Sequence, residues 1–403
     1  MSRKTGLWLI GAHGGVATTV AVGLAALRAK ASNHCGLVSS LPEFSKLDLI
    51  DWSSVVLGGH DVRDTDAVAE AAALGNGPVP VVAPAIVEAS LPYLKEFQQS
   101  IRPGVFFNSG DAIESLATDN TCVRPVNARA GVDHIKQDLT EFKERSGCEN
   151  VIVINVASTE PGSDASQFAA SWNELEGLLD QEDCGLPASS LYAIAALDLQ
   201  MPFVNFTPSV ANALPAIKDL AQQRSVCHTG SDGKTGETFL KSVLAPAFAH
   251  RNLEIMSWVG HNIFGNMDGQ ILDDPVNKKT KVASKGKMLE HMLGYQPQSH
   301  ISIEYIQSLG DWKTAWDHIH FRGFLGTPMT MQFTWQGCDS ILAAPLVLDL
   351  FRFVELAQSS GESGLLTYLA SFFKSPLGTH EHDFALQYSQ LVDWAASKQK
   401  TVA

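Results

Sequence analysis

The stretch LWLIGAHGGVATT, from Leu7 to Thr19, decides the fold class of this chain. Four apolar residues run into a glycine-rich turn, and Ala17–Arg28 follows with the composition of a helix. This order of strand, glycine turn and helix lets backbone N–H groups approach a pyrophosphate at the helix N-terminus. The stretch therefore predicts the first strand, turn and helix of a dinucleotide-binding domain.

The glycine turn also contains the first residues expected to bind the cofactor. His13 stands where the second glycine of the usual GxGxxG pattern would lie, so a tight turn without a ligand is the alternative. Asp61, at the end of a later apolar run, is expected to accept hydrogen bonds from the adenosine ribose, which favours NAD over NADP. An isolated aspartate that caps a helix is the alternative at that position. The residues expected to bind the cofactor in the turn are Gly11, Gly14, Gly15, Val16 and Ala17.

Outward from this turn, short apolar runs alternate with helical patterns. Such alternation predicts an α/β fold with a doubly wound, Rossmann-like parallel sheet covered by helices on both faces. Ala67–Leu74 and His134–Glu144 are predicted helices. The predicted strands are Leu7–Ile10, Val55–Leu57, Val79–Val82, Val105–Asn108, Val151–Val156, Tyr192–Ala196 and Phe203–Phe206.

The pattern changes after about residue 240. Gly260–Asp274 is polar and rich in turn-forming residues, and His300–Tyr305 and Thr330–Trp335 alternate like half-buried antiparallel strands. Helical periodicity returns in Leu342–Leu356 and Phe384–Ala396. The simplest division is a Rossmann-like domain of residues 1–240 plus 337–403, with an inserted α+β domain of residues 241–336.

Bulk composition narrows the possible partners. The 403 residues carry a formal net charge of -14, and an acidic surface disfavours nucleic acid and anionic membranes. No segment offers the roughly 18 uninterrupted apolar residues of a membrane span. Six scattered cysteines without ligand spacing indicate free thiols and a cytoplasmic location.

A lysine-rich segment stands out against this acidic background. Lys278, Lys279, Lys281, Lys285 and Lys287 place five ammonium groups in ten residues. A solvated charge run is the plain interpretation, whereas a phosphate and developing oxyanions would also require such a cluster. The segment just upstream, Asn262–Gly269, is dense in uncharged polar groups and glycines, which suit recognition of hydroxyl groups. We expect no metal site, because His318-x-His320 and His380-x-His382 have no third ligand placed by the sequence.

Six segments, in order along most of the chain, together resemble the inositol-3-phosphate synthase (myo-inositol-1-phosphate synthase) family. Each is a partial match, and it is their joint occurrence that is specific. The resembling segments and the family motifs are Ala157–Glu160 (TANTE), Gly230–Gly236 (GDDxKSGQT, with Thr235 for serine), Asn262–Gly269 (SYNHLGNNDG), Thr280–Lys285 (SKEISK), Asp339–Pro345 (EDSLLAAP) and Phe373–Leu377 (LKAPL).

The resemblance implies a specific reaction and architecture. The family converts glucose 6-phosphate to 1D-myo-inositol 3-phosphate with NAD that is reduced and reoxidised in each cycle. Oxidation at carbon 5 is followed by enolisation, intramolecular aldol closure and re-reduction, so the enzyme is an isomerase of inositol biosynthesis. The family's fold is a Rossmann domain with an inserted catalytic and tetramerisation domain, which implies a homotetramer.

The resemblance also assigns roles to individual residues. Lys281, Lys285 and Lys374 would stabilise oxyanions, move protons or hold phosphate. Asp232, Asp268 and Asp339 would orient lysines and hydroxyls or contact the nicotinamide. The remaining residues implied to bind substrate are Asn262, Asn266, Lys278 and Lys279, and those implied to bind cofactor are Ala157, Thr159, Thr235 and Asp339.

Two departures from the family pattern leave alternatives open. Glu304 stands where the family usually has an active-site lysine in an I-K-Y segment. Either Lys278, Lys279 or Lys313 offsets that loss, or the preferred substrate is different. The glycine turn also lacks the asparagines of the family's GGNNG. A related cyclase for another sugar phosphate, an NAD-dependent sugar-phosphate dehydrogenase and an inactive NAD-binding regulatory protein are the alternatives.

Overall fold

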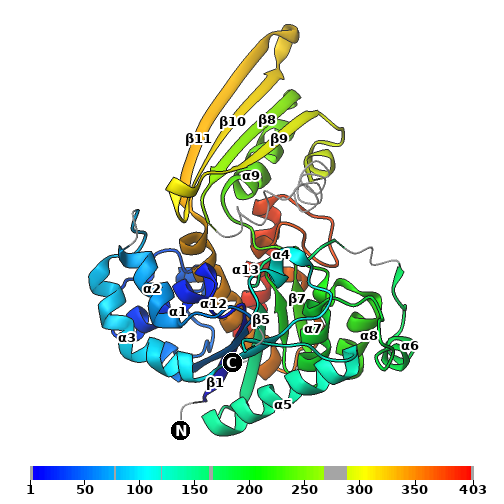
Figure 1. Cartoon of the computed structure of the whole chain (residues 1–403). Helices are drawn as coiled ribbons and strands as arrows, with labels where there is room; N and C mark the ends of the chain where they lie inside the picture. The colour runs from blue at the N-terminus through cyan, green and yellow to red at the C-terminus, as the bar shows by residue number, and fades with distance from the viewer. Residues whose placement is uncertain (1–2, 77–78, 119, 163–166, 267–287, 401–403) are drawn as a thin grey trace.

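A computed structural model describes residues 3–76, 79–118, 120–162, 167–266 and 288–400 of the chain. Within these residues the chain forms one large parallel sheet with helices around it and a second sheet that extends away from it (Figure 1). None of the helices built from the described residues combines the length and apolar composition needed to cross a bilayer.

The large sheet has eight parallel strands in the described residues, in the order β12-β7-β6-β5-β1-β2-β3-β4. β1 lies at its centre between β2 and β5, as a doubly wound fold requires. The strands are β1 (Thr5–Ile10), β2 (Val55–Asp61), β3 (Ile101–Val105), β4 (Cys122–Val123), β5 (Asn150–Asn155), β6 (Phe203–Asn205), β7 (Cys227–Gly230) and β12 (Gly364–Leu365).

Helices cover both faces of this sheet, so its central strands are apolar on both sides. Alternate residues of β1 enter different cores: Leu7 and Leu9 pack with helices α1, α3 and α12, whereas Trp8 and Ile10 pack with α5 and α7. The α-helices are α1 (Gly15–Arg28), α2 (Ala67–Asn76), α3 (Pro84–Gln99), α4 (Asp111–Glu114), α5 (Ala128–Ser146), α6 (Trp172–Leu178), α7 (Ala188–Asp198), α8 (Pro215–Gln223), α9 (Gly236–His250), α12 (Asp339–Ser359) and α13 (Phe384–Lys400). The 3-10 helices are η1 (Val38–Ser40), η2 (Pro42–Phe44), η3 (Trp52–Ser54), η5 (Ala211–Ala213), η6 (Gln307–Leu309), η7 (Phe324–Gly326) and η8 (Thr367–Phe372).

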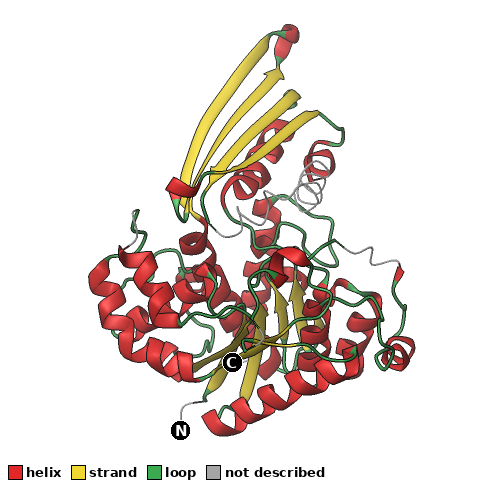
Figure 2. Cartoon of the chain, in the orientation of Figure 1, coloured by secondary structure: helices red, strands yellow, loops and turns green. Residues whose placement is uncertain are grey.

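The second sheet has four strands in the order β11-β10-β8-β9 (Figure 2). One face packs on α9, where Phe248 meets Trp258 and Ile319 in a small core. β10 is antiparallel to β8 and β11, but β9 is parallel to β8. The strands are β8 (Glu254–Phe264), β9 (Gln298–Tyr305), β10 (Trp312–Arg322) and β11 (Pro328–Cys338).

The predicted fold class, a doubly wound α/β sheet with a further sheet inserted late in the chain, is confirmed. The exact division at residues 241 and 336 stays a prediction. Most predicted strands and helices also lie where the patterns placed them, with ends that differ by a few residues.

Two predicted strands are wrong. Val79–Val82 is a bend between α2 and α3, where Val81 N donates to Leu74 O at 2.9 Å, and Pro80 cannot donate to a strand ladder. Tyr192–Ala196 lies inside α7, whose residues are buried on every side, so the helical period is hidden in a continuous apolar run.

Three further predictions need correction. The strand expected at Val105–Asn108 lies earlier, at Ile101–Val105. It was missed because Pro103 and Gly104 are typical of a turn. Gly260–Phe264, expected as part of a turn-rich segment, completes β8. His300–Tyr305 does form a strand, but it pairs in parallel with β8 rather than antiparallel.

Gly59 gives a test of how tightly the sheet centre is packed. A Cβ at Gly59 would lie 2.3 Å from Leu9 O, a backbone atom of the neighbouring strand that cannot move aside. We expect Gly59→Ala to lower the free energy of unfolding by about 3 kcal/mol in urea denaturation. In Gly23→Ala, the matched control in α1, a Cβ meets no atom within 4 Å, so we expect a gain of up to about 1 kcal/mol. Equal stability of the two variants would contradict this packing.

Candidate active site

A crevice opens at the carboxyl ends of β1 and β5, the two neighbouring strands from which the chain leaves in opposite directions. Such a switch point is where doubly wound sheets bind their ligands. A cavity of about 380 Å³ occupies it. Its walls include eight of the residues predicted to bind cofactor or substrate: Gly11, Gly14, Gly15, Val16, Asp61, Ala157, Asn266 and Asp339.

The turn after β1 needs glycine for two reasons. Gly11 has φ +84, and a Cβ there would lie 2.7 Å from Ala157 Cα. Gly14 caps α1, and its own N–H donates to Gly11 O at 2.9 Å. The open first turn of α1 therefore faces the cavity through Gly15 and Val16, an arrangement that fits a pyrophosphate.

His13, which replaces the second glycine of the usual pattern, does not fill the cavity. Its ring is buried and lies 3.1 Å from Gln98 Oε1 on α3, and His13 is not among the cavity-lining residues. Its backbone N–H donates to Asp61 Oδ2 at 2.7 Å. The departure from GxGxxG therefore leaves the cavity beside the turn open, and the backbone of His13 adds a hydrogen bond to Asp61.

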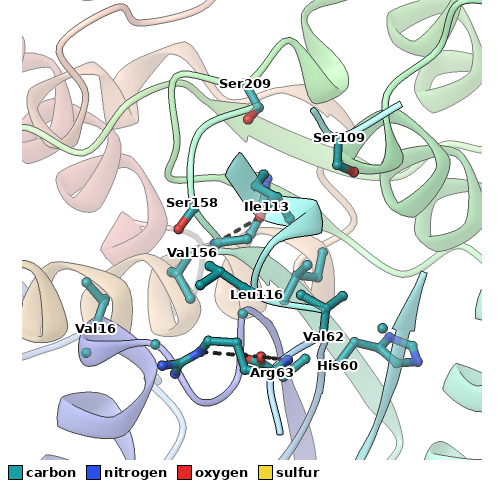
Figure 3. A pocket seen from close by; sticks show the side chains of 18 of the residues that line it. Val16, His60, Val62, Arg63, Ser109, Ile113, Leu116, Val156, Ser158 and Ser209 are labelled. Carbon is teal, nitrogen blue, oxygen red and sulfur yellow. Dashed lines mark hydrogen bonds and ion pairs between the residues drawn. The ribbon is translucent and has the colours of Figure 1, made fainter. Parts of the chain in front are cut away.

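Asp61 and Arg63 line the cavity where the sequence predicts the adenosine ribose to bind. Arg63 N donates to Asp61 Oδ1 at 2.8 Å, and the Arg63 guanidinium lies 3.7 Å from Asp61 and 3.5 Å from Glu70. Two carboxylates thus surround one cation at the predicted ribose position. Beyond them, Val62, Ile113 and Leu116 form an apolar wall suited to an adenine ring (Figure 3).

A second cavity, of about 120 Å³, adjoins the first. The two share the lining residues Val16, Val156, Ala157 and Asp339, so they form adjacent compartments of one site. The second compartment also contains the predicted site residues Thr159, Asp232, Thr235 and Lys374.

Two distant segments build this second compartment by pairing their backbones. Lys234 N donates to Phe372 O at 2.8 Å, and Lys374 N donates to Asp232 O at 2.6 Å. Gly233 is required because a Cβ there would lie 2.1 Å from the Phe206 ring. The pairing holds Lys374 Nζ 3.0 Å from Asp232 Oδ1.

Three carboxylate–lysine pairs surround the second cavity in the described part of the chain. They are Asp232 with Lys374, Asp339 with Lys313 at 3.7 Å, and Glu237 with Lys241. Such pairs hold ammonium groups in fixed orientations without leaving a buried charge uncompensated. A cavity of this kind is suited to orient sugar hydroxyls and to stabilise a developing oxyanion.

Some cavity residues were not predicted from the sequence. Asp311 accepts hydrogen bonds from Cys338 Sγ at 2.7 Å and from Ser340 Oγ, and burial raises the pKa of its carboxyl. Glu160 ends the Ala157–Glu160 segment but was given no role there. Its carboxylate accepts hydrogen bonds from the N–H and hydroxyl of Ser189, and burial raises its pKa to about 7. The only local sign of Asp311 was a Gly-Asp turn before a strand.

Other predicted site residues lie elsewhere. Ala17 is buried in α1, and Asn262 is buried on β8, where its amide nitrogen donates to Ser302 O at 3.4 Å; neither lines a cavity. Glu304 is exposed on β9 and also lines neither, whereas Lys313 does line the second cavity. The predicted site residues that lie outside the described residues are Asp268, Lys278, Lys279, Lys281 and Lys285.

Comparison with known proteins decides the family. Residues 5–395 match the model of the family described as myo-inositol-1-phosphate synthase. The chain belongs to the myo-inositol-1-phosphate synthase family. It is 31% identical to inositol-3-phosphate synthase 1 of Bacteroides thetaiotaomicron, over 98% of this chain and 94% of that protein. It is 29% identical to isozyme 1 of Arabidopsis thaliana, over 83% of this chain and 68% of that protein.

Solved structures agree on the fold. The inositol-3-phosphate synthase of Caenorhabditis elegans superposes with a TM-score of 0.87 at 23% identity, over 99% of this chain and 86% of that one. A myo-inositol-1-phosphate synthase-related protein of Thermotoga maritima gives 0.77 at 23% identity, over 98% and 99%. The large sheet and the inserted sheet are therefore features of the synthase fold.

Membership of the synthase family identifies the chain as an NAD-dependent enzyme, since the matching family model is one of NAD binding. The glycine turn, the open N-terminus of α1 and the paired Asp61 fit that cofactor. No group of three or more His, Cys, Asp or Glu residues within the described part of the chain could hold a metal ion. The roles of individual site residues stay predictions.

The ribose end predicts the choice between the two nicotinamide cofactors. We expect NAD to bind at least about 10-fold more tightly than NADP, because the 2′-phosphate would meet two carboxylates. Glu70→Gln should narrow this ratio by removing one of the two carboxylates around Arg63, as measured by isothermal titration with each cofactor. Glu254→Gln, which breaks a similar but exposed pair with Arg322, should leave the ratio unchanged. Equal affinity of the unmodified protein for NAD and NADP would refute the assignment.

Proposed function

We propose that this enzyme converts glucose 6-phosphate to 1D-myo-inositol 3-phosphate in a redox-neutral cyclisation. The observation that carries the proposal is the second cavity, where lysines paired with carboxylates adjoin the dinucleotide crevice. A dehydrogenase that releases its product needs the crevice, but enolisation and aldol closure also need cations beside successive oxyanions. The names of the relatives point to the same reaction.

Bound NAD would supply the reversible oxidation of the sugar at carbon 5. Lys374 would stabilise the oxyanions that develop during enolisation and ring closure, because its ammonium is fixed by Asp232 at the cavity wall. Asp339 and Lys313 would orient substrate hydroxyls at the boundary of the two compartments. The buried walls would keep water from reactive intermediates.

The proposal is tested by following product formation and net NADH formation together. We expect the purified protein to convert glucose 6-phosphate to inositol phosphate with NAD present, as followed by NMR, while absorbance at 340 nm shows no net NADH. Lys374→Met should lower kcat about 100-fold to 1000-fold, the usual loss for one oxyanion-stabilising group. Steady accumulation of NADH would instead indicate a sugar-phosphate dehydrogenase. If the protein cyclises only another hexose phosphate, the proposed substrate is wrong but the proposed mechanism still applies.

The proposed assembly is a homotetramer joined through the second sheet. The outer face of that sheet exposes Ile263 and Trp316, and the Trp316 ring stacks on His261 with centroids 5.7 Å apart. β11, at the edge of the sheet, contains no charged residue in eleven positions. Because natural sheet edges open to water are normally protected by charge, this edge and face are suited to be covered by another copy. The number four rests on the family resemblance.

Disruption of that face should change the assembly. We expect the unmodified chain to have the mass of four copies in light scattering, and Trp316→Lys to give a smaller species, because a charge cannot be buried there without a partner. Leu386→Lys, a change at an even more exposed apolar residue on α13, should keep the original mass. A monomeric unmodified chain would refute the assembly.

A cytoplasmic location is part of the same proposal. All six cysteines are free thiols, and Cys122, Cys148, Cys227 and Cys338 are buried. Free thiols persist in reducing compartments.

A further inference from the structure

The ring of His13 is buried beside the dinucleotide crevice, and one of its nitrogens makes no hydrogen bond. The side chain is 5% exposed, and Nδ1 has no hydrogen-bond partner among the described residues. Nδ1 lies 3.8 Å from Asp61 Oδ1, which is close enough for an ion pair but too long for a hydrogen bond. A buried polar atom without a partner is uncommon in folded proteins, so this nitrogen needs an explanation.

The other ring nitrogen shows where the proton of a neutral imidazole must lie. His13 Nε2 is 3.1 Å from Gln98 Oε1 on α3. That Gln98 atom is the amide oxygen, because the backbone N–H of Ala67 donates to it at 2.8 Å. His13 Nε2 is therefore the donor, and in neutral His13 the Nδ1 atom turns a lone pair toward the Asp61 carboxylate. Only a protonated His13, with a hydrogen on both nitrogens, attracts Asp61.

The protonation state of His13 therefore sets the net charge around Asp61. Within the described residues, the charged groups in contact with His13 are the Asp61 carboxylate and the Arg63 guanidinium, which donates to the His13 carbonyl. Arg63 in turn pairs with Glu70 on α2. α3 presents the uncharged Gln98 to the ring, and the first turn of α1 has no acidic residue. Two carboxylates and one guanidinium leave one net negative charge when His13 is neutral, and a protonated His13 cancels it.

We propose that His13 is a specificity-determining residue that makes the preference of the crevice for NAD over NADP depend on pH. Net negative charge at the predicted ribose position repels the 2′-phosphate of NADP. Protonation of His13 removes that net charge, so it weakens the repulsion of NADP and has little effect on NAD, which has no 2′-phosphate. Histidine changes its charge between pH 5 and 8, so the preference for NAD is larger at the upper end of this range. The inference rests on the predicted ribose position and does not depend on the sugar substrate.

The experiment removes the charge of His13 and keeps its contact with Gln98. His13→Gln retains a donor for Gln98 Oε1 but cannot be protonated, and His13→Asn is a second uncharged variant that needs less space. His134→Gln is the matched control, because His134 Nε2 is also buried without a hydrogen bond and lies 3.3 Å from Asp138. His134 lines neither cavity. Thermal unfolding reports on the integrity of each variant.

Isothermal titration with NAD and with NADP between pH 5.5 and pH 8 measures the preference as a ratio of two Kd values. We expect the unmodified enzyme and both His13 variants to have the same ratio at pH 8. At pH 5.5 the ratio should be about 10-fold smaller in the unmodified enzyme than in the His13 variants, the effect of one unit charge several ångströms from the phosphate. The 2′-phosphate also gains a proton over this range, but it does so with every variant, so the comparison removes its contribution. His134→Gln should follow the unmodified enzyme.

Two results overturn the inference. If the His13 variants show the same pH dependence as the unmodified enzyme, the His13 ring only fills space behind the turn. If they change the ratio by the same factor at every pH, His13 acts through its shape and not through its charge. Cofactor binding is measured without turnover, so failure of this inference is distinguishable from failure to convert glucose 6-phosphate.

Discussion

The backbone pairing between Ser231–Lys234 and Phe372–Ser375 is the interaction on which the rest of the site depends. It joins two segments separated by the whole inserted sheet and by α12. Through it the Lys374 ammonium meets Asp232, and Gly233 lies against the Phe206 ring at the end of β6. Because backbone groups make the contact, the fold itself sets the positions of the Asp232 and Lys374 side chains. The second cavity can therefore exist before a substrate arrives.

The charged side chains of this cavity are paired, which lowers the free-energy cost of burying them. A buried carboxylate or ammonium alone would be strongly destabilising, whereas a close pair with further hydrogen bonds recovers much of that cost. Asp232, Asp339 and Glu237 each have a lysine partner in the described residues. Such pairs keep the cavity polar and hold its charged groups in place, so little reorganisation would be needed in the proposed reaction when charge develops on a substrate oxygen.

Local chemistry explains which features were predictable. The turn at Gly11 was predictable because a positive φ and a close approach to Ala157 leave no other residue, and that requirement is visible in the sequence. α7 was mistaken for a strand because burial on all sides removes its period. Asp311 and Glu237 reach the site only through tertiary packing, which no spacing reveals. The roles of Lys281 and Lys285 stay predictions from family resemblance, as both lie outside the described residues.

The inserted sheet also contributes residues to the candidate site. α9 begins at the second cavity and its later turns pack on β8 and β10, so the helix ties the sheet to the crevice. β10 starts next to Asp311 and brings Lys313 to the cavity, and β11 leads directly into Asp339 at the start of α12. A sheet that served only subunit contacts would not need to supply walls of the reaction site. Its strands instead fix the distance between the dinucleotide crevice and the carboxylate–lysine pairs. Any association through the outer face would stiffen these strands and, through them, the cavity.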